Sequence, residues 1–288
     1  MKANEFLKIS NSSVTFIVFI VTVSGFFANP SSLLHLLKLI PLVVSGYLLS
    51  MAAVVFNNIY DRDIDGKMSR TEFRIPLINA SRTWLKYFAV TSFTAGTVII
   101  FLLVNYVSAA FLVLGFISYT FLYTMVLKRK TSLNIVIGGI AGSFAALSGW
   151  MAPSVVLGVL PVLIAVFVFA WMSLHFLVFS LIYNDDYMKT ELPMLPAKKG
   201  ISTAIKVISL NGGIVLVISV LPLLTGTRYF FDVYLWVAAV MGAILVLYIL
   251  QLNVKEFSTR SVRPLLGYSV VYLVVMVFSF GIIRVLGR

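Results

Sequence analysis

Apolar residues follow one another along this chain in long runs, with little of the alternation that marks half-buried strands or amphipathic helices. A helix needs about 20 mainly apolar residues to cross roughly 30 Å of hydrocarbon. Nine runs meet or approach this length. We predict transmembrane helices at about 14–28, 33–60, 85–104, 107–127, 135–151, 155–182, 205–224, 233–252 and 265–286. The expected fold is all-α, a polytopic membrane protein with nine transmembrane helices in one bundle.

Composition supports this fold class. Of the 288 residues, 60% are hydrophobic and 11% are charged, and the mean hydropathy is +1.04, well beyond the balance of soluble domains. The first run lacks a small-x-small cleavage signal, so we interpret it as a membrane helix rather than a cleaved signal peptide. We treat residues 1–288 as a single transmembrane domain. The chain has no cysteine, which excludes disulfides, thiolate metal sites and a cysteine nucleophile.

The positive charges predict an orientation in the cell membrane. Formal net charge is +12, and 18 of the 22 Lys and Arg residues fall in the N-terminal segment or in the loops after the second, fourth, sixth and eighth runs. The other side has only Lys38, Arg228, Arg284 and Arg288. The positive-inside rule therefore makes the N-terminus and those loops cytoplasmic and the C-terminus external. Because topology accounts for the basic excess, we expect no nucleic-acid partner.

The second apolar run ends in the sequence Asn57-Asn58-Ile59-Tyr60-Asp61-Arg62-Asp63-Ile64-Asp65. Asn57, Asp61 and Asp65 recur every four residues, which on a helix places them in one row, while Asp63 points the other way. The run of 28 residues would reach about 42 Å as a helix. It should therefore extend beyond the hydrocarbon and carry Asp61 and Asp65 into the interfacial layer.

This row of oxygen ligands suits Mg²⁺. That ion keeps several waters and is normally shared between one or two carboxylates and the phosphates of a substrate. Arg62, Arg70 and Arg74 flank the row, so the pattern favours a metal-bridged diphosphate. The alternative is a solvated, charge-balanced loop between two membrane helices.

A second acidic cluster follows the sixth run, where Tyr183-Asn184-Asp185-Asp186-Tyr187 ends the apolar stretch. By the predicted topology it lies on the same side as the first cluster. Two acidic helix ends on one face of the bundle could clamp one diphosphate through Mg²⁺ ions, which would also neutralise the leaving group. The chemistry is therefore expected at the cytoplasmic edge.

His175 precedes Asp186 by 11 residues, about three helical turns, and should share its face about 16 Å deeper in the membrane. A polar ring at that depth is a functional candidate if it faces a cavity. The alternative is a histidine that is hydrogen-bonded to a neighbouring helix.

Basic and aromatic residues at the cytoplasmic helix ends allow two interpretations. Lys128 and Arg129, with Lys130, either anchor the fourth helix at the interface or contact diphosphate or an acidic acceptor. The tyrosines at 119, 123, 183 and 187 are more typical of an interfacial belt than of catalytic groups. Tyr123 or Tyr183 could still shield a cation.

These motifs resemble the UbiA superfamily of intramembrane prenyltransferases, and within it the branch that acts on haem. The resemblance spans about residues 55 to 200. It is carried by residues 57–65 with Met68, Arg70-Thr71 and Arg74; by Leu127-Lys128-Arg129-Lys130-Thr131, Asn134-Ile135-Val136-Ile137-Gly138-Gly139 and Gly149-Trp150; and by His175-Phe176, residues 183–187 and Pro193-Met194-Leu195-Pro196.

The resemblance implies transfer of farnesyl from farnesyl diphosphate to the 2-vinyl group of haem B, with addition of water. Haem B would be a substrate, not a resident cofactor, and the farnesyl tail would enter from membrane lipid. The protein partners that the resemblance implies are haem A synthase or proteins that assemble terminal oxidases. The implied catalytic residues are Asp61, Asp65, Asp185 and Asp186, which with Asn57 would hold Mg²⁺. The implied substrate-binding residues are Arg70, Arg74, Lys128, Arg129, His175, Tyr123 and Tyr183.

Two other functions fit the same sequence features. Another UbiA-type enzyme would keep the aspartates but prenylate an aromatic or quinone precursor or a glycerol phosphate lipid. An ion-coupled transporter would use its carboxylates to bind a cation, and it predicts important acidic residues near the bilayer midplane.

Overall fold

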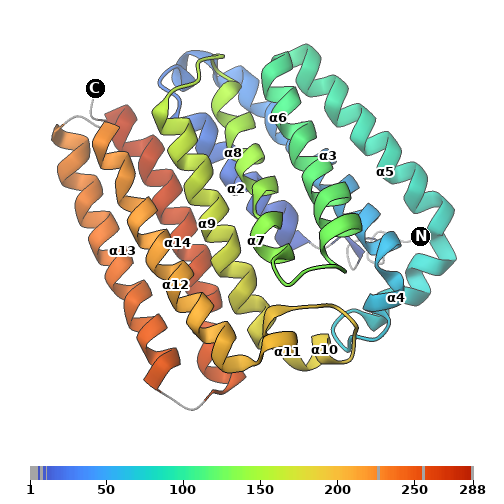
Figure 1. Cartoon of the computed structure of the whole chain (residues 1–288). Coiled ribbons are helices and arrows are strands. Elements are labelled where there is room, and N and C mark those ends of the chain that lie inside the picture. Colours follow the sequence, from blue (N-terminus) through green and yellow to red (C-terminus); the bar gives the residue numbers. More distant parts are fainter. Residues whose placement is uncertain (1–5, 7–8, 11, 226–227, 255–256, 287–288) are drawn as a thin grey trace.

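The computed structural model describes residues 6, 9–10, 12–225, 228–254 and 257–286. Within these ranges every regular element is helical, and the long helices stand side by side in one bundle (Figure 1). The predicted fold class is therefore confirmed.

Seventeen helical segments follow one another along the described chain. In the first half they are α2 (Ser12–Ala28), η1 (Ser32–Lys38), α3 (Leu39–Tyr60), α4 (Arg62–Asp65), η2 (Glu72–Arg74), α5 (Ile75–Leu103), α6 (Tyr106–Ile117), η3 (Ser118–Leu127), α7 (Asn134–Gly138) and α8 (Ile140–Met151). In the second half they are α9 (Val159–Ile182), α10 (Asn184–Met188), α11 (Leu195–Lys199), α12 (Ile201–Val220), η4 (Leu221–Thr225), α13 (Arg228–Val254) and α14 (Thr259–Leu286).

Eight of the nine predicted spans are long and apolar enough to cross a membrane in the described residues. The first span is shorter, because α2 contains 17 residues. The third begins about ten residues before its predicted start at 85, where Pro76 occupies the first turn of α5, a position that proline favours. The second was expected to be one continuous helix, but it opens with the 3-10 segment η1.

Two further spans are irregular in ways that the apolar pattern does not reveal. The fourth changes from the α-helix α6 to the π-helix η3 for its last ten residues. The fifth is divided into α7 and α8 at Gly139. Hydropathy responds to burial in lipid and not to the hydrogen-bond pattern inside a helix, so it cannot detect either change.

Both acidic segments lie at one end of the bundle. Figure 1 shows α4, α10 and α11 together there, with the turn that joins η3 to α7 beside them. The predicted placement of the two clusters on the same side is thus confirmed. Lys2, Lys8, Lys255 and Arg288, which contribute to the predicted orientation, lie outside the described residues.

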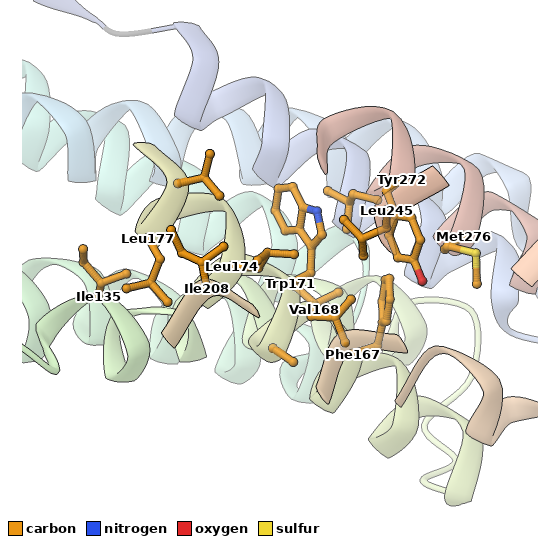
Figure 2. Packing of buried hydrophobic residues seen from close by; sticks show 14 of the residues in the cluster. Ile135, Phe167, Val168, Trp171, Leu174, Leu177, Ile208, Leu245, Tyr272 and Met276 are labelled. Carbon is orange, nitrogen blue, oxygen red and sulfur yellow. The ribbon is translucent and has the colours of Figure 1, made fainter. Parts of the chain in front are cut away.

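The core is organised around α9. Phe167, Trp171 and Leu174 of this helix are completely buried, and they pack with Ile208 of α12 and Tyr272 of α14 (Figure 2). The indole Nε1 of Trp171 donates to the backbone oxygen of Ser269 at 2.6 Å. This contact satisfies the polar atom of a buried tryptophan.

The crossing of α2 and α8 brings two backbones into direct contact. A Cβ at Gly149 would overlap the backbone oxygen of Thr22, and a Cβ at Gly25 would overlap that of Ala146. Small residues allow this close approach of membrane helices. It places α8 between α2, α6 and α9, where it forms a wall of the site described below.

We predict that Gly149→Ala destabilises the protein, because the added methyl forces α2 and α8 apart. Overpacking of this kind costs about 1–3 kcal/mol. The free energy of unfolding in mixed micelles should fall by that amount. The control is Gly267→Ala on α14, where an added Cβ meets no atom within 4 Å. Equal stability of the Gly149→Ala variant and the parent would contradict the close crossing.

Candidate functional site

The acidic row lies where α3 ends. The backbone turns out of α-helical geometry at Asp61 (φ −89°, ψ 10°), yet the i to i+4 hydrogen bonds continue across the turn, from Asp61 N to Asn57 O and from Asp65 N to Asp61 O, both at 2.8 Å. Asp61 is 0% exposed and Asp65 is 6% exposed, whereas the side chain of Asp63 is 59% exposed. The prediction that Asp61 and Asp65 share a face away from Asp63 is confirmed.

Buried Lys128 pairs with Asp61. Its Nζ donates to Asp61 Oδ2, which also accepts a hydrogen bond from Asn57 Nδ2 at 2.7 Å. Burial opposes the charged form of Lys128, but Asp61, together with Tyr123 and Asp65, outweighs this effect and raises the pKa of the lysine. Lys128 is therefore a charged component of the site and not an interfacial anchor.

Arg129 binds the exposed side of the same cluster. Its guanidinium donates to both oxygens of Asp63 at 2.8 Å and approaches Asp61 at 3.4 Å. The hydrogen bonds from Arg129 lower the pKa of Asp63. Asp63 is thus occupied by a surface ion pair, while Asp61 and Asp65 face the interior.

The π-helix η3 positions Lys128. Thr124 Oγ1 donates to the carbonyl of Tyr119, and the N–H of Lys128 donates to the carbonyl of Tyr123; each bond spans five residues. Such segments hold one more residue per turn than an α-helix and are frequent at functional sites. Thr124 also accepts a hydrogen bond from Asn57 at 3.1 Å. The sequence does not single out this threonine, because its neighbours depend on the π-helical register.

Arg70 and Arg74 supply positive charge near Asp65, but neither forms a salt bridge within the described part of the chain. The Nε atoms of both side chains are buried without a hydrogen-bond partner. The guanidinium carbon of Arg70 lies 5.1 Å from the ring centroids of both Phe179 and Tyr183, within cation–π range. These two arginines can therefore bind an anion without breaking an existing ion pair.

Asp186 joins the second acidic cluster to the first. Its carboxylate accepts hydrogen bonds from the backbone N–H groups of Ser69 and Arg70 at 3.1 and 3.2 Å and from Lys189 Nζ at 3.3 Å. Burial opposes ionisation, but these hydrogen bonds prevail and lower the pKa of Asp186. Asp185 is exposed. The loop that carries Arg70 is therefore held in place by a residue more than one hundred positions further along the chain.

His175 lies between α9 and α14. Its Nδ1 is 2.8 Å from Ser269 Oγ, and its ring stacks on Trp171 with centroids 5.0 Å apart. The structure thus places this histidine in a hydrogen bond with a neighbouring helix. The large apolar cavity described next is lined by the adjacent residues Met172 and Phe176.

An apolar cavity, partly open to the outside, begins beside the carboxylates. Its walls come from α2, α3, α6, η3, α7, α8 and α9. Tyr119 and Tyr123 line the end nearest the acidic row, and Lys128 Nζ lies 6.0 Å from the Tyr123 ring centroid. The interpretation of these two tyrosines as an interfacial belt is wrong.

The donor set fits Mg²⁺ that is shared with a ligand. Among the described residues no three His, Cys, Asp or Glu side chains form a ready-made metal cage. Mg²⁺ usually binds one or two carboxylates together with substrate phosphates, and Asp61 and Asp65 offer two buried carboxylates. Burial raises the pKa of Asp65 although nearby Lys128, Arg70 and Arg74 lower it, so the cost of burying the charge of Asp65 is only partly offset. A bound cation would compensate it.

Fold and site together define an intramembrane protein with an apolar cavity beside a cluster of carboxylates and basic side chains. The chain belongs to the UbiA prenyltransferase family, whose model matches residues 18–280. Protoheme IX farnesyltransferase 2 of Picrophilus torridus is 38% identical over 283 residues, 98% of each chain. Protoheme IX farnesyltransferase of Alcanivorax borkumensis is 32% identical over 273 residues, 93% of this chain and 89% of that protein.

Solved structures share the fold. A digeranylgeranylglyceryl phosphate synthase superposes with a TM-score of 0.74 at 17% identity, over 98% of both chains. A UbiA homologue from Archaeoglobus fulgidus bound to GPP and Mg²⁺ gives a TM-score of 0.67 at 15% identity, over 96% of this chain and 99% of that chain.

We predict that Asp186→Ala releases the loop at Ser69 and Arg70. Hydrogen bonds to a charged group contribute about 1.5–3 kcal/mol, so amide exchange at these two positions should accelerate roughly ten- to a hundredfold. Hydrogen exchange read by mass spectrometry measures this rate. Asp185→Ala is the matched control, because Asp185 is the exposed neighbour. Exchange as slow in Asp186→Ala as in the parent would show that other contacts hold the loop.

Proposed function

We propose that this chain is a protoheme IX farnesyltransferase, which transfers farnesyl from farnesyl diphosphate to the 2-vinyl group of haem B, with addition of water, to give haem O. The observation that carries the assignment is the 38% identity, over 98% of both chains, to a relative of that name. The site supports the assignment, since buried carboxylates, and arginines that form no salt bridge in the described residues, stand beside an apolar cavity.

In this proposal Asp61 and Asp65, with Asn57, hold Mg²⁺ from the α3 side, and Asp185 and Asp186 hold it from α10. When bound, Mg²⁺ neutralises the diphosphate as it departs. The remaining charge of the diphosphate is offset by the basic residues of the site: Arg70, Arg74, Lys128 and Arg129. Because Arg70 and Arg74 have no carboxylate partner in the described residues, they are available to bind the anion.

The bond-forming step follows from the loss of diphosphate. Cleavage of the carbon–oxygen bond leaves an allylic cation, and the rings of Tyr123 and Tyr183 present electron-rich faces that shield it. The vinyl group of haem B then supplies the electron pair for the new carbon–carbon bond. Water captures the resulting porphyrin-stabilised cation and loses a proton. His175 remains our candidate for a haem contact.

The farnesyl chain occupies the apolar cavity in this proposal. Burial of hydrocarbon contributes about 25 cal/mol per Å² removed from water, so a chain of this size strongly favours an apolar site or the lipid around it. Met172 and Phe176 of α9 and Ile135 of α7 contribute apolar walls. Entry from the lipid would avoid exposure of the tail to water.

The ion-coupled transporter is set aside by family membership, and the acidic clusters stand at helix ends and not at mid-membrane depth. Another acceptor would be prenylated if the chain were a different member of the family. Product analysis separates these enzymes, because all of them share the diphosphate chemistry.

We further propose that the site faces the cytoplasm in the cell membrane, from the division of Lys and Arg between the loops. A membrane-impermeant amine reagent applied to intact cells should then spare Lys67 and Lys198, while a protease should reach the loop at Arg228. Modification of Lys67 in intact cells would reverse the orientation.

The function predicts a defined product. Purified protein incubated with haem B, farnesyl diphosphate and Mg²⁺ should yield a porphyrin whose mass increases by one farnesyl group and one hydroxyl group. Mass spectrometry of the extracted porphyrin measures this. If haem B remained unmodified while a quinone precursor or lipid was prenylated in a parallel incubation, the acceptor would be that compound and not haem B.

Within the same assay we predict that Asp61→Asn and Asp65→Asn nearly abolish turnover. Loss of about 3–4 kcal/mol of transition-state stabilisation slows a reaction several hundredfold. Asp63→Asn is the matched control, because that side chain is exposed and bound to Arg129, and its rate should fall much less. Parental rates and an unchanged Mg²⁺ requirement for Asp61→Asn would exclude the row from catalysis.

A further inference from the structure

The apolar cavity has a polar end and a deep end, which the directions of its helices define. On α3 the lining residues run from Ala53, nearest the carboxylates, to Gly46. Gly46 precedes Asp61 by 15 residues, which corresponds to about 22 Å along the helix at 1.5 Å per residue. The cavity therefore extends well into the membrane-spanning part of the bundle.

The other walls agree with this direction. On α6 and η3 the lining runs from Tyr123 at the polar end to Leu112, and on α7 and α8 it runs from Ile135 to Ala145. A cluster of buried apolar side chains continues from this level: it shares Leu49 and Leu112 with the cavity wall and includes Leu42 and Phe26. These side chains border the cavity at its deep end, near Gly46.

Gly46 differs from the other glycines of the cavity wall. A Cβ built at Gly115, Gly138 or Gly142 would meet a heavy atom at 2.7–3.2 Å, so tight packing accounts for glycine there. A Cβ at Gly46 would meet nothing within 4 Å, although the residue is buried. A buried position with no neighbouring atom borders empty space, so the missing side chain of Gly46 is part of the cavity.

No feature of the backbone explains this glycine. Gly46 lies inside the regular part of α3, and Gly200 is the only glycine with positive φ among the described residues. Glycine inside a helix is less favourable than alanine, because it loses more conformational freedom on folding. Alanine at this position would therefore make the helix more stable. We attribute the glycine to the cavity, because the absence of a side chain leaves space there.

We propose that Gly46 sets the longest prenyl tail that this chain accepts. The inference rests on the proposed function, in which the tail lies in the cavity with its diphosphate at the carboxylates. A side chain at position 46 would project into the deep end and shorten the cavity from below. It would leave the diphosphate site about 22 Å away unchanged.

The test measures binding of a diphosphate series without any acceptor. Geranyl, farnesyl and geranylgeranyl diphosphates differ by one isoprene unit at each step, and their dissociation constants are measured with Mg²⁺ for the parent, Gly46→Ala and Gly46→Leu. In Gly46→Leu we expect the affinity for farnesyl diphosphate to fall about tenfold or more relative to that for geranyl diphosphate. Gly46→Ala should give a smaller change in the same direction. Both variants should unfold at or above the parental temperature.

Gly213→Leu on α12 is the control, because it is also a helical glycine whose Cβ would meet nothing within 4 Å, but it is exposed and away from the cavity. Its tail-length profile should match the parent. If Gly46→Leu lost affinity equally for all three diphosphates, or lost none, the role assigned to Gly46 would be overturned but the proposed function would not. A parent that binds none of the three diphosphates would overturn the proposed function itself. If the parent bound the diphosphates but did not prenylate haem B, the acceptor would be another compound, and the role of Gly46 would stand.

Discussion

The buried ion pair between Asp61 and Lys128 is the interaction on which the rest of the polar end depends. A carboxylate with no exposed surface is costly to bury alone, and loss of one partner of such a pair typically costs about 3–5 kcal/mol. The pair joins the end of α3 to the end of η3. Asn57 and Thr124 complete the network, and the π-helical register places Thr124 where it can take part.

Charge is distributed unequally across this site. Lys128 and Arg129 form salt bridges with Asp61 and Asp63, while Arg70 and Arg74 form none in the described structure. Two unpaired guanidinium groups beside the acidic row suit an anion that brings its own cation. The aromatic faces around Arg70 hold one of these groups without neutralising it. The same end of the bundle can thus attract a diphosphate and stay charged until it arrives.

The features that could be predicted from the sequence are those that depend on residues close together in the chain. Long apolar runs located the spans, and the four-residue spacing identified the buried face of Asp61 and Asp65, because both patterns depend on burial and helix periodicity alone. The π-helix, the break at Gly139 and the bond from His175 to Ser269 depend on contacts between helices and left no such pattern. The motif Asp185-Asp186-Tyr187 likewise gives no sign that Asp186 accepts hydrogen bonds from the backbone N–H groups of Ser69 and Arg70.

That contact between Asp186 and the loop at Ser69 spans 117 residues, and it has a consequence for biosynthesis. The ribosome delivers the chain from its N-terminus, and spans are made long before their later neighbours. When the acidic row of α3 has emerged, the carboxylate that fixes the adjacent loop has not been synthesised. The nascent protein therefore contains only half of its binding site while several further helices insert into the membrane. A chain truncated before α10 would have the carboxylate row but would lack the residue that orders the arginine loop beside it.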